Sequence, residues 1–137
     1  MDIAFAGYGY DTEAGASNKA FIGLHEADPT NRIVWRVYLS HSSPIVSLRY
    51  NPTYDTIVAV MNSPFTIVQL NSSDGSVYKS AHVNTGTNDV TQANNLFVNS
   101  NNDIFVQYLS PSLHPSLIYF DANLDNSRWS FFGKAIS

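Results

Sequence analysis

The sequence contains no cysteine, which excludes disulfide bonds, thiolate metal sites and cysteine nucleophiles. Charged residues make up only 13% of the chain, about half of the roughly 25% usual in globular proteins. The net charge is −4 and lysine and arginine form no run, so we expect no nucleic-acid partner, because neutralising phosphates requires a basic face. No apolar run approaches the roughly 18 residues that a membrane helix needs, and MDIAFAGYGYD lacks the basic start and apolar core of a secretory signal. We therefore expect neither membrane insertion nor a signal peptide.

The polar residues are mainly asparagine, serine and threonine, which form turns as readily as they face water. Clusters of these residues with proline or glycine interrupt the chain every eight to twelve residues or so, and no segment keeps a helical period over three turns. The sequence therefore predicts one all-β domain over residues 1–137. Its compartment stays open; the one relevant feature is Asn71-Ser72-Ser73, a glycosylation acceptor that favours an extracellular or surface setting.

The chain is organised around the segment 65–80, FTIVQLNSSDGSVYKS, in which two strand-like runs flank Asp74-Gly75. This dipeptide is typical of β-hairpins because both residues tolerate positive φ. We expect positive φ at Gly75, and therefore expect asparagine to be tolerated there but valine not. Strands are predicted at 1–10, 20–25, 32–40, 45–50, 56–61, 65–70, 76–80, 95–98, 104–109, 117–120 and 128–132, with a polar loop at 11–19.

The hairpin unit occurs three times. An aromatic residue closes each copy, at Trp35, Tyr78 and Trp129, with separations of 43 and 51 positions. The residue before each turn is apolar: Leu24, Leu70 and Phe120. Four-stranded units of about 40–50 residues are typical of propeller blades. The units cover about 1–40, 44–83 and 94–134.

The segments LHEADPTNRIVW, LNSSDGSVY and FDANLDNSRW resemble degenerate copies of the quinoprotein-type propeller repeat, apolar–Asp–x–x–Thr–Gly–x–x–x–Trp. Asp121-Ala122-Asn123 with Trp129 matches it best, and Asp74-Gly75 with Tyr78 matches the turn and the aromatic residue. The resemblance implies a β-propeller of the non-enzymatic branch, in a repeat class that includes enzymes, lipoprotein scaffolds and binding modules. It also implies that Trp35, Tyr78 and Trp129 pack between blades.

The first unit lacks an opening strand, so the sequence predicts about three blades, the first incomplete, whereas closed propellers need roughly four to eight. An open arc exposes blade faces and residues such as Phe131. We therefore expect a non-catalytic structural or protein-interaction module whose arc is completed by self-association, in a ring or filament, or by another chain; three copies would supply about eight blades. The alternatives are a fragment of a carbohydrate-binding or enzymatic propeller, or a β-sandwich.

Oxygen ligands at alternate positions, Asp121, Asn123 and Asp125, resemble a calcium loop. The sixth position of such a loop is Asn126 instead of glycine and the twelfth is Phe132 instead of glutamate, so an Asx-rich turn competes with the calcium interpretation. No other cofactor is expected, because a quinone would need stacking aromatics around a closed channel and Gly7-Tyr8-Gly9 is too short for a phosphate loop.

No catalytic residue is predicted. The four histidines are scattered without metal-ligand spacing, at His25, His41, His82 and His114. His41, Ser43 and Asp55 form no recognisable triad, because nothing gives Ser43 a nucleophile elbow or an oxyanion hole.

Overall fold

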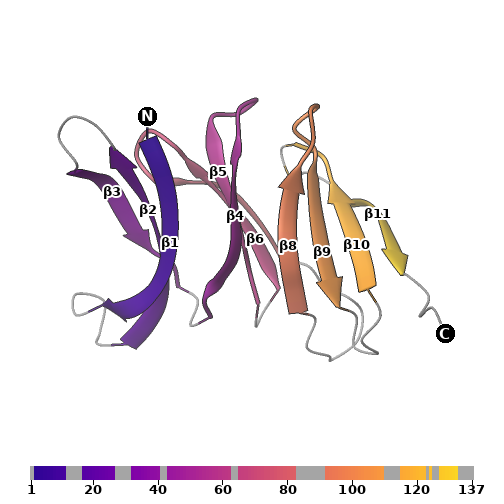
Figure 1. The fold of residues 1–137 in the computed structure, drawn as a ribbon, viewed down its shortest axis with the longest axis horizontal. Coiled ribbons are helices and arrows are strands. Elements are labelled where there is room, and N and C mark those ends of the chain that lie inside the picture. Colours follow the sequence, from indigo (N-terminus) through magenta and orange to yellow (C-terminus); the bar gives the residue numbers. More distant parts are fainter. Residues whose placement is uncertain are drawn as a thin grey trace.

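The computed structural model describes residues 2–11, 17–26, 32–40, 43–62, 65–82, 92–109, 115–122, 124 and 127–132. These residues form eleven β-strands and no helix, which confirms the all-β prediction (Figure 1). Short β-branched and aromatic runs separated by Asn, Ser, Pro and Gly produce this result, because such runs fit a pleated surface and the punctuating residues favour turns.

The strands form three antiparallel sheets in which neighbours in sequence are neighbours in space. Sheet 1 holds β1 (Asp2–Asp11), β2 (Ser17–Glu26) and β3 (Arg32–Tyr38). Sheet 2 holds β4 (Ile45–Asn51), β5 (Thr56–Met61), β6 (Thr66–Asn71) and β7 (Val77–His82). Sheet 3 holds β8 (Gln92–Val98), β9 (Ile104–Leu109), β10 (Pro115–Phe120) and β11 (Ser127–Phe132).

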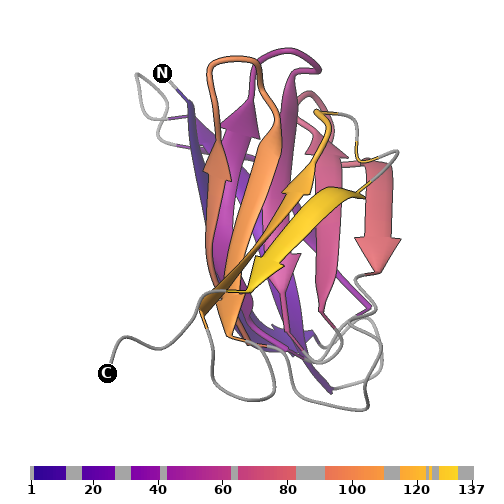
Figure 2. The same ribbon diagram turned by 90° about the vertical axis from the view of Figure 1, so that its right-hand side faces the viewer.

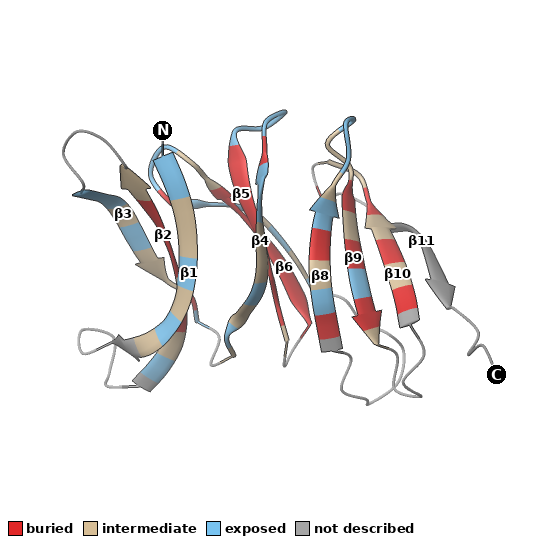
Figure 3. Cartoon of the chain, in the orientation of Figure 1, coloured by how far each residue is buried: buried red, intermediate tan, exposed pale blue. Residues whose placement is uncertain are grey.

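The sheets are stacked in chain order, with sheet 2 between the other two (Figures 1 and 2). All residues of β5, and all residues of β6 except the last, are buried and are coloured red in Figure 3. Both faces of these two strands are therefore covered. Alternate residues of β5 serve two different cores because side chains alternate across a strand. Ile57 and Ala59 face sheet 1, whereas Val58 and Val60 face sheet 3. The continuously apolar TIVAVM run is thus explained by burial on both sides.

Each sheet carries a β-bulge between its last two strands. The bulged residues, which have no register partner, are Val34, Tyr78 and Arg128. The residues that follow them are therefore equivalent: Trp35, Lys79 and Trp129. The sequence alignment was wrong by one position at Tyr78: it took the aromatic residue of that strand, whereas the register places Lys79 level with the two tryptophans.

The same register corrects the predicted alignment of the first unit. The residue equivalent to Leu70 and Phe120 is His25 and not Leu24. It also shows that β1 is equivalent to β5 and β9, since each pairs with the strand before the bulged one. The predicted loop at 11–19 was too long: Asp11 pairs with Ser17, so the hairpin strands continue into this polar segment.

Sheets 2 and 3 are joined by polar contacts as well as by their core. The backbone carbonyl of Ala122, in the turn between β10 and β11, accepts hydrogen bonds from Asn51 Nδ2 and Gln69 Nε2, both at 3.0 Å. Gln69 Oε1 accepts a third bond from Thr56 Oγ1 at 2.7 Å. Asn51, Thr56 and Gln69 are fully buried, and these bonds compensate the cost of removing their polar groups from water.

Candidate interaction surfaces

The outer face of sheet 1, which points away from sheet 2, carries a row of aromatic rings. The rings of Phe5 and Phe21 lie 6.1 Å apart edge to face, and Phe21 and Tyr38 lie 5.8 Å apart. The Arg36 guanidinium carbon lies 5.5 Å from the Tyr38 ring centre, within cation–π range. Ile3, on the same face, is 49% exposed. We call this surface, comprising Ile3, Phe5, Phe21, Arg36 and Tyr38, end face 1.

Glycines let these rings lie flat on the sheet. A Cβ atom added at Gly7 would collide with the Phe21 ring, and one added at Gly23 would collide with the Phe5 ring. Phe21 is brought to Gly7 only by the pairing of β1 with β2. These two rings therefore lie directly over glycine backbone.

The outer face of sheet 3, which points away from sheet 2, is also apolar. Phe105 and Tyr119 are register partners and their ring centres lie 5.0 Å apart. Phe97 pairs with Phe105 and is 45% exposed, and Leu117 pairs with Gln107. We call this surface, comprising Phe97, Phe105, Gln107, Leu117 and Tyr119, end face 3.

The register shows which internal faces these surfaces correspond to. Phe105 and Tyr119 are equivalent to Val58 and Gln69, which are buried against sheet 3. On end face 1, Phe5 is equivalent to Ala59, which is buried against sheet 1. Each end face therefore corresponds by register to a face that is covered elsewhere in the same molecule.

Trp35, predicted to pack between repeats, lies between sheets 1 and 2. It is half-buried, and its indole Nε1 donates a hydrogen bond of 2.7 Å to the carbonyl of Ser72. Its ring lies over Gly75, where φ is +75°, the positive value expected at that turn. An added Cβ at Gly75 would lie 2.6 Å from Trp35 Cε3, so the structure now predicts that asparagine is destabilising there.

The other predicted packing residues lie elsewhere. Tyr78 is 40% exposed and stacks on Tyr54 at 5.7 Å, so it does not replace Trp35 between sheets. The register pairs Trp129 with Tyr119 and Phe131 with Leu117 in sheet 3. The side chains of Trp129 and Phe131 lie outside the described part of the structure.

Of the calcium candidates, Asp121 follows β10, whereas Asn123 and Asp125 lie outside the described residues. The described part of the chain contains no group of three or more His, Asp or Glu side chains placed to hold a metal ion. Asn71, the glycosylation candidate, is half-buried, and its Nδ2 donates to Ser76 Oγ at 2.8 Å. Calcium binding and glycosylation both stay predictions.

A cleft of about 440 Å³ opens between sheets 1 and 2 near the turns. It is lined by apolar side chains and by the polar groups of Asp2, Tyr50, Asp55 and Ser72. Asp55, at φ +50°, accepts hydrogen bonds from Ser72 Oγ at 2.6 Å and from Tyr50 Oη at 2.8 Å. The hydrogen bond from Ser72 and, to a smaller extent, the hydrogen bond from Tyr50 lower the pKa of the Asp55 carboxyl. The hydrogen bond to Asp55 raises the pKa of the Tyr50 hydroxyl.

The lowered pKa of Asp55 predicts a loss of stability in acid. Because the carboxylate is favoured in the folded state, its contribution is complete above the ordinary pKa of 3.8 and is lost as the pH falls through the lower folded value. We expect the difference in unfolding free energy between the wild type and Asp55→Asn to be constant near neutrality and to shrink below about pH 4. Urea titrations from pH 6 to pH 3 measure it.

Ser72→Ala is the matched variant, because it removes the bond that contributes most to the lowered pKa. It should reduce the pH dependence without abolishing it, since Tyr50 still donates to the carboxylate. Identical pH profiles for the wild type and Asp55→Asn would show that these bonds do not contribute to folding.

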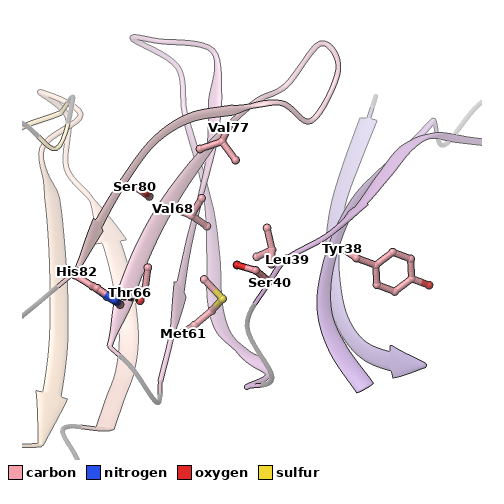
Figure 4. A pocket seen from close by; sticks show the side chains of 9 residues that line it. All are labelled: Tyr38, Leu39, Ser40, Met61, Thr66, Val68, Val77, Ser80 and His82. Carbon is pink, nitrogen blue, oxygen red and sulfur yellow. Dashed lines mark hydrogen bonds between the residues drawn. The ribbon is translucent and has the colours of Figure 1, made fainter. Parts of the chain in front are cut away.

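A second cleft, of about 330 Å³, lies between sheets 1 and 2 at the opposite end (Figure 4). Thr66 Oγ1 and His82 Nδ1 are 2.9 Å apart on its wall, and the Tyr38 ring points away from it. The described residues that line the cleft are Tyr38, Leu39, Ser40, Met61, Thr66, Val68, Val77, Ser80 and His82. This described lining includes no carboxylate that could act with His82 as an acid–base pair. The cleft therefore has no recognisable catalytic arrangement.

Among the described residues, no helix is long and apolar enough to cross a membrane. Comparison of the sequence with protein-family models and with curated proteins gives no match.

Proposed function

We propose that this chain is a non-catalytic structural and protein-interaction module, an incomplete β-propeller whose open ends bind further sheets. One observation carries the proposal: both end faces are apolar and at least partly exposed, with Ile3 at 49% and Phe97 at 45%, although their register equivalents are buried inside the stack. Sheet faces of this kind remain exposed in few monomeric proteins, because covering them with another apolar surface is favourable.

The register favours a second copy of the chain as the partner. Each sheet has one face that carries Val58 or its equivalent and an opposite face that carries Ala59 or its equivalent, and both internal interfaces join a face of the first kind to a face of the second. End face 3 is of the first kind and end face 1 is of the second. End face 3 of one molecule would therefore meet end face 1 of the next in the way that sheet 2 meets sheet 3. Each chain contributes three sheets, so two copies would contribute six. This number lies within the range of about four to eight blades found in closed propellers.

Such a contact joins different surfaces of two identical chains. Head-to-tail contacts of this kind close into a ring if the rotation per step permits and otherwise grow into filaments. A specific interface needs roughly 800 Å² from each partner. The residues that define end face 3 carry no charge, and the Arg36 guanidinium of end face 1 lies over the Phe21 and Tyr38 rings.

Light scattering at micromolar concentration tests the proposal. We expect the wild-type chain to have a mass that is a multiple of 15.1 kDa. Ile3→Glu on end face 1 and Phe97→Glu on end face 3 should each give a monomer, because each variant blocks one side of the contact with a charge. An equimolar mixture should form a dimer and nothing larger, since only one pair of unblocked faces remains.

Val77→Glu is the matched control. Val77 is 59% exposed on β7, away from both end faces, so its replacement should leave the mass unchanged. A wild-type chain that stays at 15.1 kDa and unfolds cooperatively would overturn self-association. Dimers formed by either blocked variant alone would show that like faces pair instead.

Carbohydrate binding is the second candidate, and the cleft near Asp55 favours it. Two carboxylates, the Tyr50 hydroxyl and the exposed Tyr50 ring meet there beside apolar side chains, a combination suited to a small polar ligand. Titration with a panel of oligosaccharides, followed through Trp35 fluorescence, tests it because Trp35 is bonded to Ser72 on the cleft wall. Saturable binding that is lost in Asp55→Ala would support this candidate.

A further inference from the structure

Sheet 1 has three strands where sheets 2 and 3 have four. The strand without a counterpart is the first one, since β1 is equivalent to β5 and β9. In sheets 2 and 3 the first strands, β4 and β8, pair with β5 and β9 along their full length. Among the described residues, no strand pairs with the corresponding edge of β1.

The neighbours of this edge show where an added strand would lie. β8 runs alongside β4, and it also touches β5; β4 in turn touches β1 (Figure 1). Because β1 is the equivalent of β5, a strand on its free edge would run alongside β4 as β4 runs alongside β8. Ser47 Oγ donates to Asn95 Oδ1 at 3.2 Å across that existing pair, and the same hydroxyl has lone pairs left to accept a bond from a new neighbour.

β4 and β8 share a residue pattern at equivalent positions. With the bulge of each strand taken into account, Ser47 and Asn95 occupy equivalent register positions, and so do Leu48 and Leu96. Leu96 is buried in the core between sheets 2 and 3, and Leu48 packs on the core between sheets 1 and 2. A strand that fits this position therefore needs Ser or Asn followed by Leu.

We propose that the free edge of β1 binds an extended peptide segment of a partner protein, antiparallel, with a Ser-Leu or Asn-Leu pair. Leu48 pairs with Ala59, whose equivalent in β1 is Phe5. The leucine of the partner therefore lies opposite Phe5, beside the aromatic rings of end face 1, and the preceding Ser or Asn lies opposite Ala6. Main-chain hydrogen bonds to the unpaired edge provide affinity and the leucine provides specificity, as in other strand-addition complexes.

This inference concerns an edge of sheet 1, whereas the proposed self-association concerns two sheet faces, so either holds without the other. The probe is a synthetic peptide with the sequence of residues 44–51, PIVSLRYN, added to the full chain. The protein carries Phe97→Glu, which blocks end face 3 and leaves sheet 1 unchanged. Amide hydrogen exchange, resolved by NMR, reports which strand the peptide protects.

We expect the peptide to slow exchange at alternate residues of the segment 2–7 by about tenfold or more at saturation. A peptide with Asp in place of the leucine should bind at least about tenfold more weakly, because a charge would be buried beside Phe5. Attaching residues 44–55 before Asp2 should raise the unfolding midpoint above that of a scrambled fusion, because the tether raises the effective concentration of the strand.

Protection at β3, at β7 or at β4 instead of β1 would overturn the inference, as would equal binding of the two peptides. Equal unfolding midpoints for the native and scrambled fusions, with no protection of β1 at millimolar peptide, would also overturn it. The mass of the wild-type assembly does not enter this result, so failure here and failure of the self-association are distinguishable.

Discussion

Replacing Gly75 with alanine is expected to lower the free energy of unfolding by about 2–4 kcal/mol, for two separate reasons. Gly75 has φ +75°, which costs an L-residue about 1 kcal/mol or more. The added Cβ would also lie 2.6 Å from Trp35 Cε3, and the indole ring is held in place by its hydrogen bond to Ser72. Urea unfolding followed by circular dichroism measures the loss.

The double variant with Trp35→Ala separates these reasons. Without the indole ring the collision disappears, so Gly75→Ala should then cost only about 1 kcal/mol for its backbone conformation. Gly75→Asn should be destabilising in the wild-type background, although asparagine tolerates positive φ, because its Cβ meets the same ring. Equal costs of Gly75→Ala with and without Trp35 would contradict the collision.

Gln69→Leu is expected to cost about 1–3 kcal/mol of unfolding free energy although leucine has a similar size. The change removes the donor to the Ala122 carbonyl, which keeps its bond from Asn51. It also leaves the buried Thr56 hydroxyl without the acceptor that it now has 2.7 Å away. Unsatisfied buried polar groups bear the desolvation cost without a compensating bond, which is why the hydroxyl dominates the expected loss.

Thr56→Val in the Gln69→Leu background provides the control. Replacing both partners with apolar groups removes the unsatisfied hydroxyl, so the double variant should be more stable than Gln69→Leu alone. Denaturant titrations of the two single variants and the double variant give the coupling energy. A double variant that loses the sum of the single losses would show that the Thr56–Gln69 bond contributes nothing.

These residues also show where the predicted three-unit pattern and the observed register differ. Trp35 and Trp129 occupy equivalent register positions, as the sequence predicted, but the third member is Lys79 and not Tyr78. Gln69 and Tyr119 are equivalent although one is a buried amide and the other an aromatic ring. Equivalent positions differ because one face of sheet 3 is exposed while its counterpart in sheet 2 is covered.

The sequence alone determined the all-β class and the hairpin turn at Gly75, because these follow from local chemistry. Alternation, turn residues and positive φ involve neighbours within about ten positions. The register of the bulges was not accessible in this way, since an extra residue in one strand becomes visible only when the partner strand is in place.

Only the tertiary structure decided which apolar faces are covered. Val58 and Phe105 are both apolar residues at equivalent strand positions, and nothing in their local sequence shows that the first is buried and the second borders the exterior. Likewise the Phe21 ring over Gly7 and the indole of Trp35 over Gly75 join residues that are distant in the chain. Burial depends on the order in which whole sheets stack, and that order is a property of the assembled chain, not of any one segment.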